Sequence, residues 1–226
     1  MLEPTPKVPE PEPACCIVGG GPGGMMLALL LARRGVPVTL LEAHRDFDRD
    51  FRGDTIHPST LEALDQIGLA EPLLRLPHGR LDAIRIHSAS GVVTVAEFHR
   101  LRTPFPFITI LPQVRFLEFL ADEARRYPNF TLLMGAAARE LILDEGVVRG
   151  VRYFDTDERA HEIRARLTIG ADGRFSKVRA LAGAVPIRAS PPIDVLWFRL
   201  PREPGDARDQ VNFYADGGRF VFFLDR

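Results

Sequence analysis

After a proline-rich start, the chain opens with a strand–helix–strand pattern of apolar positions. Residues 15–18 form a short apolar run, and a second apolar run covers residues 38–42. Between them, apolar side chains recur at helical spacing over residues 25–34, and Gly35 follows as a natural left-handed cap. This order predicts a βαβ unit at the beginning of the chain.

The period of the pattern changes between residues 59 and 127. Short helical segments come first, and alternating apolar runs bounded by turn residues follow. An amphipathic segment then closes the region. We expect helices at 59–67 and 69–76, strands at 83–87, 92–98 and 107–111, and a helix at 113–127.

The remainder of the chain is predicted to be rich in strands, interrupted by a basic helix at 176–181. The expected strands are 131–134, 141–143, 147–154, 162–169, 194–200, 210–214 and 220–224, of which the second to fourth form a meander. The last run would leave an unpaired apolar edge. We therefore expect the sequence to be the front part of a longer protein, or a truncated one.

A glycine loop joins the first predicted strand to the first helix. Gly19, Gly21 and Gly24 occupy the three glycine places of the dinucleotide-binding fingerprint, and Glu42 follows at about the expected 20 residues. Gly19 permits the tight turn, Gly21 lets the backbone approach a pyrophosphate, and Gly24 lets the helix pack closely. Glu42 suits a ribose hydroxyl, which favours an adenosine without a 2′-phosphate. The alternative is a glycine turn in an unrelated α/β domain.

Composition narrows the classes of function. With 226 residues, 46% of them hydrophobic, the chain can form one or two domains with a sizeable core. Because 29 basic and 30 acidic residues nearly balance, we expect neither nucleic acid nor an anionic membrane as a partner. Cys15 and Cys16 would point to opposite faces of a strand, which favours reduced thiols in a cytoplasmic protein. The apolar stretch 25–32 is too short to span a membrane.

Two further segments join the fingerprint to form a recognisable combination. Arg52 precedes residues 53–58, Gly-Asp-Thr-Ile-His-Pro, and residues 170–179 read Gly-Ala-Asp-Gly-Arg-Phe-Ser-Lys-Val-Arg. Together, over residues 14–226, these motifs resemble the class A FAD-dependent aromatic monooxygenases of the para-hydroxybenzoate hydroxylase type. Residues 170–173 look like that family's DG motif, which touches FAD and the nicotinamide cofactor. Gln113 matches a position that contacts FAD.

The resemblance implies an α/β fold of the glutathione-reductase type. This is a Rossmann-like FAD-binding βαβ domain with an inserted β-rich substrate domain, here truncated at the C-terminus. The family chemistry is hydride transfer from NADH or NADPH to the flavin, after which O2 gives a flavin C4a-hydroperoxide that hydroxylates an aromatic or similar electron-rich small molecule. The expected segments are a flexible tail at 1–13, the FAD-binding domain at 14–80 and 112–183, and substrate-domain strands at 81–111 and 184–226 (the latter incomplete).

The expected cofactor-binding residues come from the fingerprint and from the resemblance. They are Gly19, Gly21, Pro22, Gly23, Gly24, Glu42, Ala43, Arg52, Gln113, Asp172 and Gly173. No residue is assigned a catalytic role, because the cofactor carries the reaction, and none is assigned to a metal. Alternatives stay open for four of them: Glu42 as a solvated strand end, Arg52 as a surface charge, Asp172 as a turn former and Gln113 as a helix-start residue.

One departure from the family leaves other functions open. The family's third motif, a Gly-Asp sequence that binds the riboflavin end of FAD, would fall beyond Arg226. The chain is therefore also consistent with a truncated, non-catalytic module that binds FAD or ADP, or with an FAD-dependent reductase on the same scaffold. The substrate, the choice between NADH and NADPH and the oligomeric state do not follow from the sequence.

Overall fold

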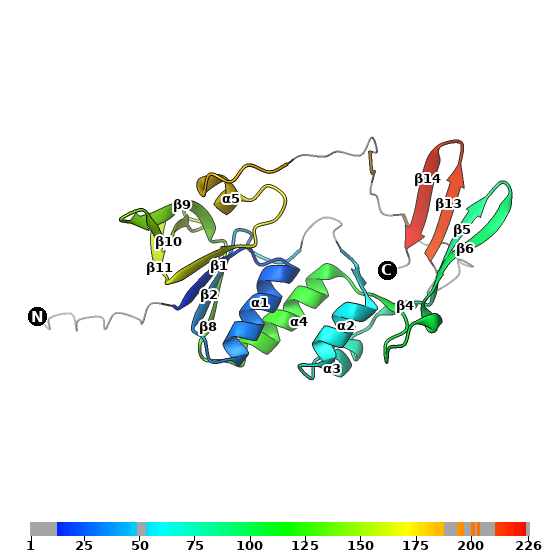
Figure 1. The fold of residues 1–226 in the computed structure, drawn as a ribbon, viewed down its shortest axis with the longest axis horizontal. Coiled ribbons are helices and arrows are strands. Elements are labelled where there is room, and N and C mark those ends of the chain that lie inside the picture. Colours follow the sequence, from blue (N-terminus) through cyan, green and yellow to red (C-terminus); the bar gives the residue numbers. More distant parts are fainter. Residues whose placement is uncertain are drawn as a thin grey trace, which may run out of the picture. The chain divides into compact units, whose positions relative to one another are not determined.

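The computed structural model describes residues 13–48, 53–187, 194–196, 200–201, 203 and 211–224. The chain divides into two compact units. The first contains Met1–Phe47 and Leu117–Ser190, and the second contains Asp48–Phe116 and Pro191–Arg226. Each unit has its own sheets, as Figure 1 shows.

A four-stranded parallel sheet forms the centre of the first unit, in the order β12-β1-β2-β8. Helices α1 and α4 lie on one face of this sheet (Figure 1). β1 and β2 are buried at every position, as is typical of parallel strands covered on both faces. The elements are β1 (Cys15–Val18), α1 (Pro22–Arg33), β2 (Val38–Glu42), α4 (Gln113–Arg125, which belongs to this unit from Leu117 onward), β8 (Phe130–Met134) and β12 (Leu167–Gly170).

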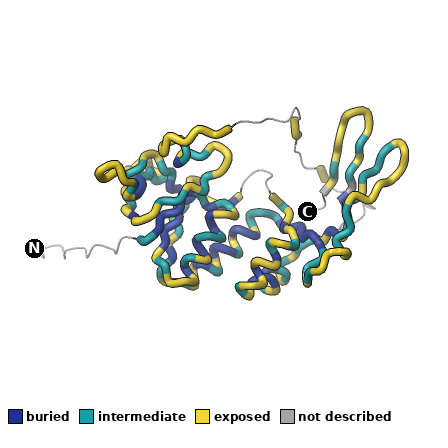
Figure 2. The backbone as a smooth tube through the Cα atoms, in the orientation of Figure 1, coloured by how far each residue is buried: buried dark blue, intermediate teal, exposed yellow. Residues whose placement is uncertain are grey.

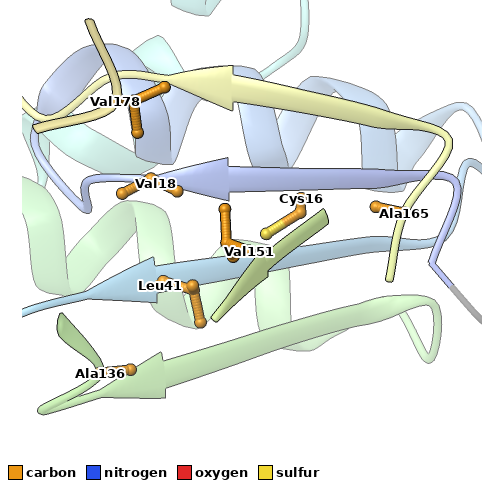
Figure 3. Packing of buried hydrophobic residues seen from close by; sticks show 7 residues of the cluster. All are labelled: Cys16, Val18, Leu41, Ala136, Val151, Ala165 and Val178. Atoms are coloured by element: carbon orange, nitrogen blue, oxygen red, sulfur yellow. The ribbon is translucent and has the colours of Figure 1, made fainter. Parts of the chain in front are cut away.

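An antiparallel meander covers the other face of the parallel sheet. Its strands are β9 (Ala137–Asp144), β10 (Val147–Phe154) and β11 (Ala160–Arg164), in the order β11-β10-β9. Val151 of β10 packs over Cys16, Val18 and Leu41 of the sheet in one buried cluster (Figure 3). Val178, from the short helix α5 (Lys177–Leu181), joins the same cluster. The sheet is therefore the middle layer of three.

The ends and the buried face of α1 follow from its sequence. Pro22 stands at the start of the helix, where its missing N–H costs nothing. The side chains buried on one face of the helix recur at helical spacing. They are Met25, Ala28, Leu29 and Ala32. Gly35 follows the last turn with φ of 74°, as a left-handed helix stop requires. The predicted βαβ unit is confirmed, although α1 begins at Pro22 rather than at residue 25.

The described residues of the second unit form two sheets and two short helices. One sheet has the order β14-β13-β5-β6, and the other has the order β3-β7-β4. Figure 2 shows that the two hairpins of the larger sheet are mostly exposed. The elements are β3 (Thr55–Ile56), α2 (Pro58–Asp65), α3 (Ala70–Leu74), β4 (Gly79–Leu81), β5 (Ala83–Ser88), β6 (Gly91–Glu97), the 3-10 turn η1 (Phe98–Arg100), β7 (Ile108–Ile110), β13 (Val211–Asp216) and β14 (Arg219–Leu224).

The prediction of a single strand at 162–169 is wrong. The chain changes sheets there: β11 pairs antiparallel with β10, and β12 pairs parallel with β1. Buried Ala165 marks the change, since its amide donates to Arg149 at 2.9 Å while the amide of Leu167 already donates to Ala14 at 3.1 Å. Neither glycine nor proline lies between the two strands, so the sequence carries no turn signal.

Some other predicted elements also differ. Residues 194–196 and 200 lie outside any strand, against the strand expected at 194–200, whose other residues lie outside the described ranges. The short strands β3 and β4 were not predicted, because two or three residues are too few to show alternation. In the described ranges, no helix has the length and apolarity that a membrane span requires.

Replacing Leu29 by Ala should cost far more stability than replacing its neighbour Leu30. Leu29 is fully buried in α1, whereas Leu30 is 39% exposed. We expect Leu29→Ala to lower the free energy of unfolding by about 2–5 kcal/mol. Leu30→Ala should lower it by less than about 1 kcal/mol. Urea unfolding followed by circular dichroism measures both. Equal losses would contradict the observed orientation of α1.

Alkaline pH should destabilise the protein partly through Cys16. Burial, with a smaller contribution from Cys15, raises the pKa of the Cys16 thiol to about 12. The stabilisation from this group is complete below the pKa of the unfolded thiol and is lost as pH rises toward 12. Between pH 9 and 11, the free energy of unfolding of the parent protein should fall faster than that of Cys16→Ala, by about 1.4 kcal/mol per pH unit. Parallel slopes in urea titrations would refute this.

Candidate functional site

The glycine loop after β1 is held by backbone contacts that leave no room for a side chain at Gly19 or Gly24. The Gly19 amide donates to Leu41 at 2.8 Å, and the Ala171 amide donates to Val18 at 2.7 Å. Gly19 has φ of 111°, and a Cβ there would overlap the carbonyl oxygen of Ala171. A Cβ on Gly24 would overlap the carbonyl oxygen of Gly19. The loop, the start of α1 and the segment after β12 therefore meet backbone to backbone.

The start of α1 has the chemistry of an anion site. Gly21 is its N-cap residue and supplies no side-chain acceptor, and the first turn contains no acidic residue. Because the first amides of a helix lack an intrahelical acceptor, the Gly23 and Gly24 amides stand at its positive end. A Cβ on Gly21 would meet nothing within 4 Å, so the space beside the loop is open. This arrangement suits a phosphate group.

Glu42 lies at the end of β2 and is only 3% exposed. Its Oε2 accepts the Gly20 amide at 2.8 Å, and its Oε1 accepts the His44 amide at 2.9 Å. These bonds attach the carboxylate to the loop on one side and to the segment after β2 on the other. Glu42 is thus a buried group attached to the loop rather than a solvated strand end, and its contact with ribose stays a prediction.

The Asp172 carboxylate caps helix α5. Its Oδ1 accepts the Ser176 hydroxyl at 2.5 Å, and its Oδ2 accepts the amides of Lys177 at 2.6 Å and Val178 at 3.0 Å. These bonds support the alternative in which Asp172 shapes the turn between β12 and α5. Gly173 follows with φ of 78° and open space beside it. The predicted contacts of Asp172 and Gly173 with a cofactor are not tested by these bonds.

In the second unit, Gln113 lies beside the segment before α2. Its amide donates to Asp54 Oδ1 at 3.2 Å, and its side-chain Nε2 would lie 2.6 Å from a Cβ on Gly53. The structure therefore brings the Gly53–Asp54 motif and Gln113 together across 59 residues of sequence. Arg52 lies outside the described residues.

The other predicted contacts are at the ends of elements. Pro22 and Gly23 begin α1, and a Cβ on Gly23 would meet nothing within 4 Å. Ala43 is exposed directly after β2. His44, which the sequence analysis missed, has its ring Nδ1 at 2.7 Å from Glu42 Oε1. Only its position two residues after Glu42 could have suggested this contact.

A second group of titratable side chains lies at the turn between β10 and β11. Asp155 accepts the Arg159 amide at 2.9 Å and lies 2.7 Å from His161. These bonds, the Arg159 amide first, lower the pKa of Asp155, and burial raises the pKa of Tyr153. The group holds a turn. Within the described ranges, no cluster of three His, Cys, Asp or Glu residues could hold a metal ion.

Comparison with known proteins agrees with this geometry. The family described as "FAD binding domain" matches residues 12–210. The 6-methylpretetramide 4-monooxygenase of Streptomyces rimosus is 36% identical over 207 residues, which is 91% of this chain and 49% of that protein. The chain thus spans about half the length of this curated relative.

Solved structures show the same fold. The anhydrotetracycline hydroxylase OxyS from Streptomyces rimosus superposes with a TM-score of 0.63 and 30% identity over 76% of this chain and 34% of its own. The p-nitrophenol 4-monooxygenase PnpA from Pseudomonas putida has a TM-score of 0.67 and 25% identity over 76% and 44%. The predicted α/β fold with a Rossmann-like unit is confirmed, and so is FAD as the cofactor. The chain belongs to the FAD binding domain family, within the class A FAD-dependent monooxygenases that its motifs resemble.

Proposed function

We propose that this chain is the FAD-binding part of an NAD(P)H-dependent monooxygenase that hydroxylates an aromatic or similar electron-rich small molecule. The observation that carries the proposal is the open loop at Gly21, with bare amides on one side and buried Glu42 beside it. The relatives named as monooxygenases and hydroxylases support the reaction class.

The described residues fit the ADP half of FAD. The Gly21 loop and the Gly23 and Gly24 amides would hold the diphosphate, and Glu42 would accept a hydrogen bond from the adenosine ribose. Bound FAD supplies the electron transfer and the oxygen chemistry, so the residues of this chain bind and orient it. Contacts from Ala43, Arg52, Gln113, Asp172 and Gly173 remain part of the proposal.

We also propose a segment organisation for the chain. Residues 14–80 and 112–183 would bind FAD, and residues 81–111 and 184–226 would belong to the substrate domain, after a tail at 1–13. We place the protein in the cytoplasm because both cysteines are free and buried. The proposed partners are the small-molecule substrate, O2 and either NADH or NADPH.

Two measurements separate this function from its alternatives. A monooxygenase must place an atom of ¹⁸O2 in its product, whereas an FAD-dependent reductase on the same scaffold would consume NAD(P)H without incorporating the label. A non-catalytic module would bind ADP and FAD with equal strength and give no product. Oxidation of NAD(P)H at the same rate with and without a phenolic substrate would argue against the hydroxylase.

Gly21→Ala should weaken nucleotide binding without unfolding the protein. Gly21 has φ of −72° and ψ of 177°, which alanine adopts freely, and its Cβ would point into open space. We expect the Kd for ADP and for FAD to rise about tenfold or more, because the methyl group keeps phosphate from the amides. The free energy of unfolding of the nucleotide-free protein should change by less than about 1 kcal/mol.

Leu30→Ala, on the exposed side of the same helix, is the matched control. Isothermal titration should return an unchanged Kd for this control. If Gly21→Ala also binds both nucleotides as tightly as the parent protein, the phosphates do not lie at this loop.

A further inference from the structure

His44 lies just after the carboxyl end of β2, and its exposed ring is held by a contact with Glu42. Its side chain is 61% exposed, whereas the Glu42 side chain beside it is 4% exposed. The ring Nδ1 lies 2.7 Å from Glu42 Oε1, and the His44 amide donates to the same oxygen at 2.9 Å. The ring is therefore the solvent-facing neighbour of a buried carboxylate.

The backbone on both sides of this pair is also fixed. The Gly135 amide donates to the His44 carbonyl at 2.7 Å, and the Ala136 amide donates to the Glu42 carbonyl at 2.8 Å. The segment 42–44 thus continues to follow the turn after β8 once β2 has ended. Because the backbone of this segment is already held by hydrogen bonds, it loses little further conformational entropy when a ligand binds.

The two oxygens of Glu42 are oriented from opposite sides. Oε2 accepts the Gly20 amide of the phosphate-binding loop, and Oε1 faces His44. An ionised carboxylate only accepts, so the ring donates to Oε1 in the tautomer that carries a proton on Nδ1. This bond adds to the two backbone amide bonds that already restrain the last torsion of the Glu42 side chain, an angle that is broad without such bonds.

We propose that His44 is a positioning residue of the adenosine site, which holds the Glu42 carboxylate in the orientation that meets the ribose 2′-hydroxyl. This inference rests on the proposed function, since it requires the nucleotide to lie against the Gly21 loop. His44 acts through Glu42. Selectivity for a free 2′-hydroxyl therefore belongs to the pair of side chains and not to the carboxylate alone.

Binding of ADP and 2′-deoxy-ADP to the full chain tests this role. The parent protein should prefer ADP by about tenfold, the value of one good hydrogen bond. His44→Phe keeps the ring volume and loses the donor, so the preference should fall to within about twofold of unity. His44→Asn offers an amide donor near the position of Nδ1–H and should restore most of the preference.

His161→Ala is the matched control. It also removes a histidine that lies 2.7 Å from a carboxylate, that of Asp155, in the same unit. The His161→Ala variant should prefer ADP over 2′-deoxy-ADP to the same extent as the parent protein. A loss of packing or stability alone would weaken both nucleotides equally and leave their ratio unchanged.

The outcomes separate the inference from the function beneath it. If the parent protein binds neither ADP nor FAD, the proposed function fails and the inference fails with it. If the parent binds ADP and prefers it over 2′-deoxy-ADP, but His44→Phe keeps that preference, only the role of His44 is overturned. A parent protein that binds both nucleotides equally well also overturns the inference and leaves the proposed function standing.

Discussion

The first unit depends on the close meeting of three backbone segments at the carboxyl end of β1. The carbonyl of Gly19 occupies the space of a side chain on Gly24, and the carbonyl of Ala171 occupies the space of a side chain on Gly19. A methyl group at either glycine would push α1 or the segment after β12 away from the loop. Since this contact sets how closely the start of the helix approaches the loop, the direction of its first amides depends on it too.

A buried acid at the end of β2 joins the sheet to the loop. Glu42 accepts backbone amides from Gly20 and His44, so hydrogen bonds compensate part of its buried charge. Burying a carboxylate without such partners is costly. The same bonds that satisfy the charge also set the loop, which links the stability of the βαβ unit to its chemistry.

The sequence predicts the βαβ unit well, because Gly19, Gly24 and Glu42 report local geometry that few other residues permit. It predicts β12 poorly, since the change of sheet at Ala165 is determined by a partner strand about 150 residues earlier and not by a local turn signal. The contact of His44 with Glu42 is equally invisible in a pattern of apolar positions. Gln113 was expected from a family resemblance, and the structure adds its bond to Asp54.

The position of β12 has a consequence for biosynthesis. β1 is the second-from-edge strand of its sheet, and its outer neighbour β12 can join it only after Leu167–Gly170 has been translated. Until then, the turn at Gly19 lacks its contact with the backbone of Ala171. Contacts of such long range make folding slow, because a large loop must close before they form. A nascent chain would therefore acquire its flavin nucleotide late, and an interruption of synthesis before residue 171 would leave a βαβ fragment without a finished binding loop.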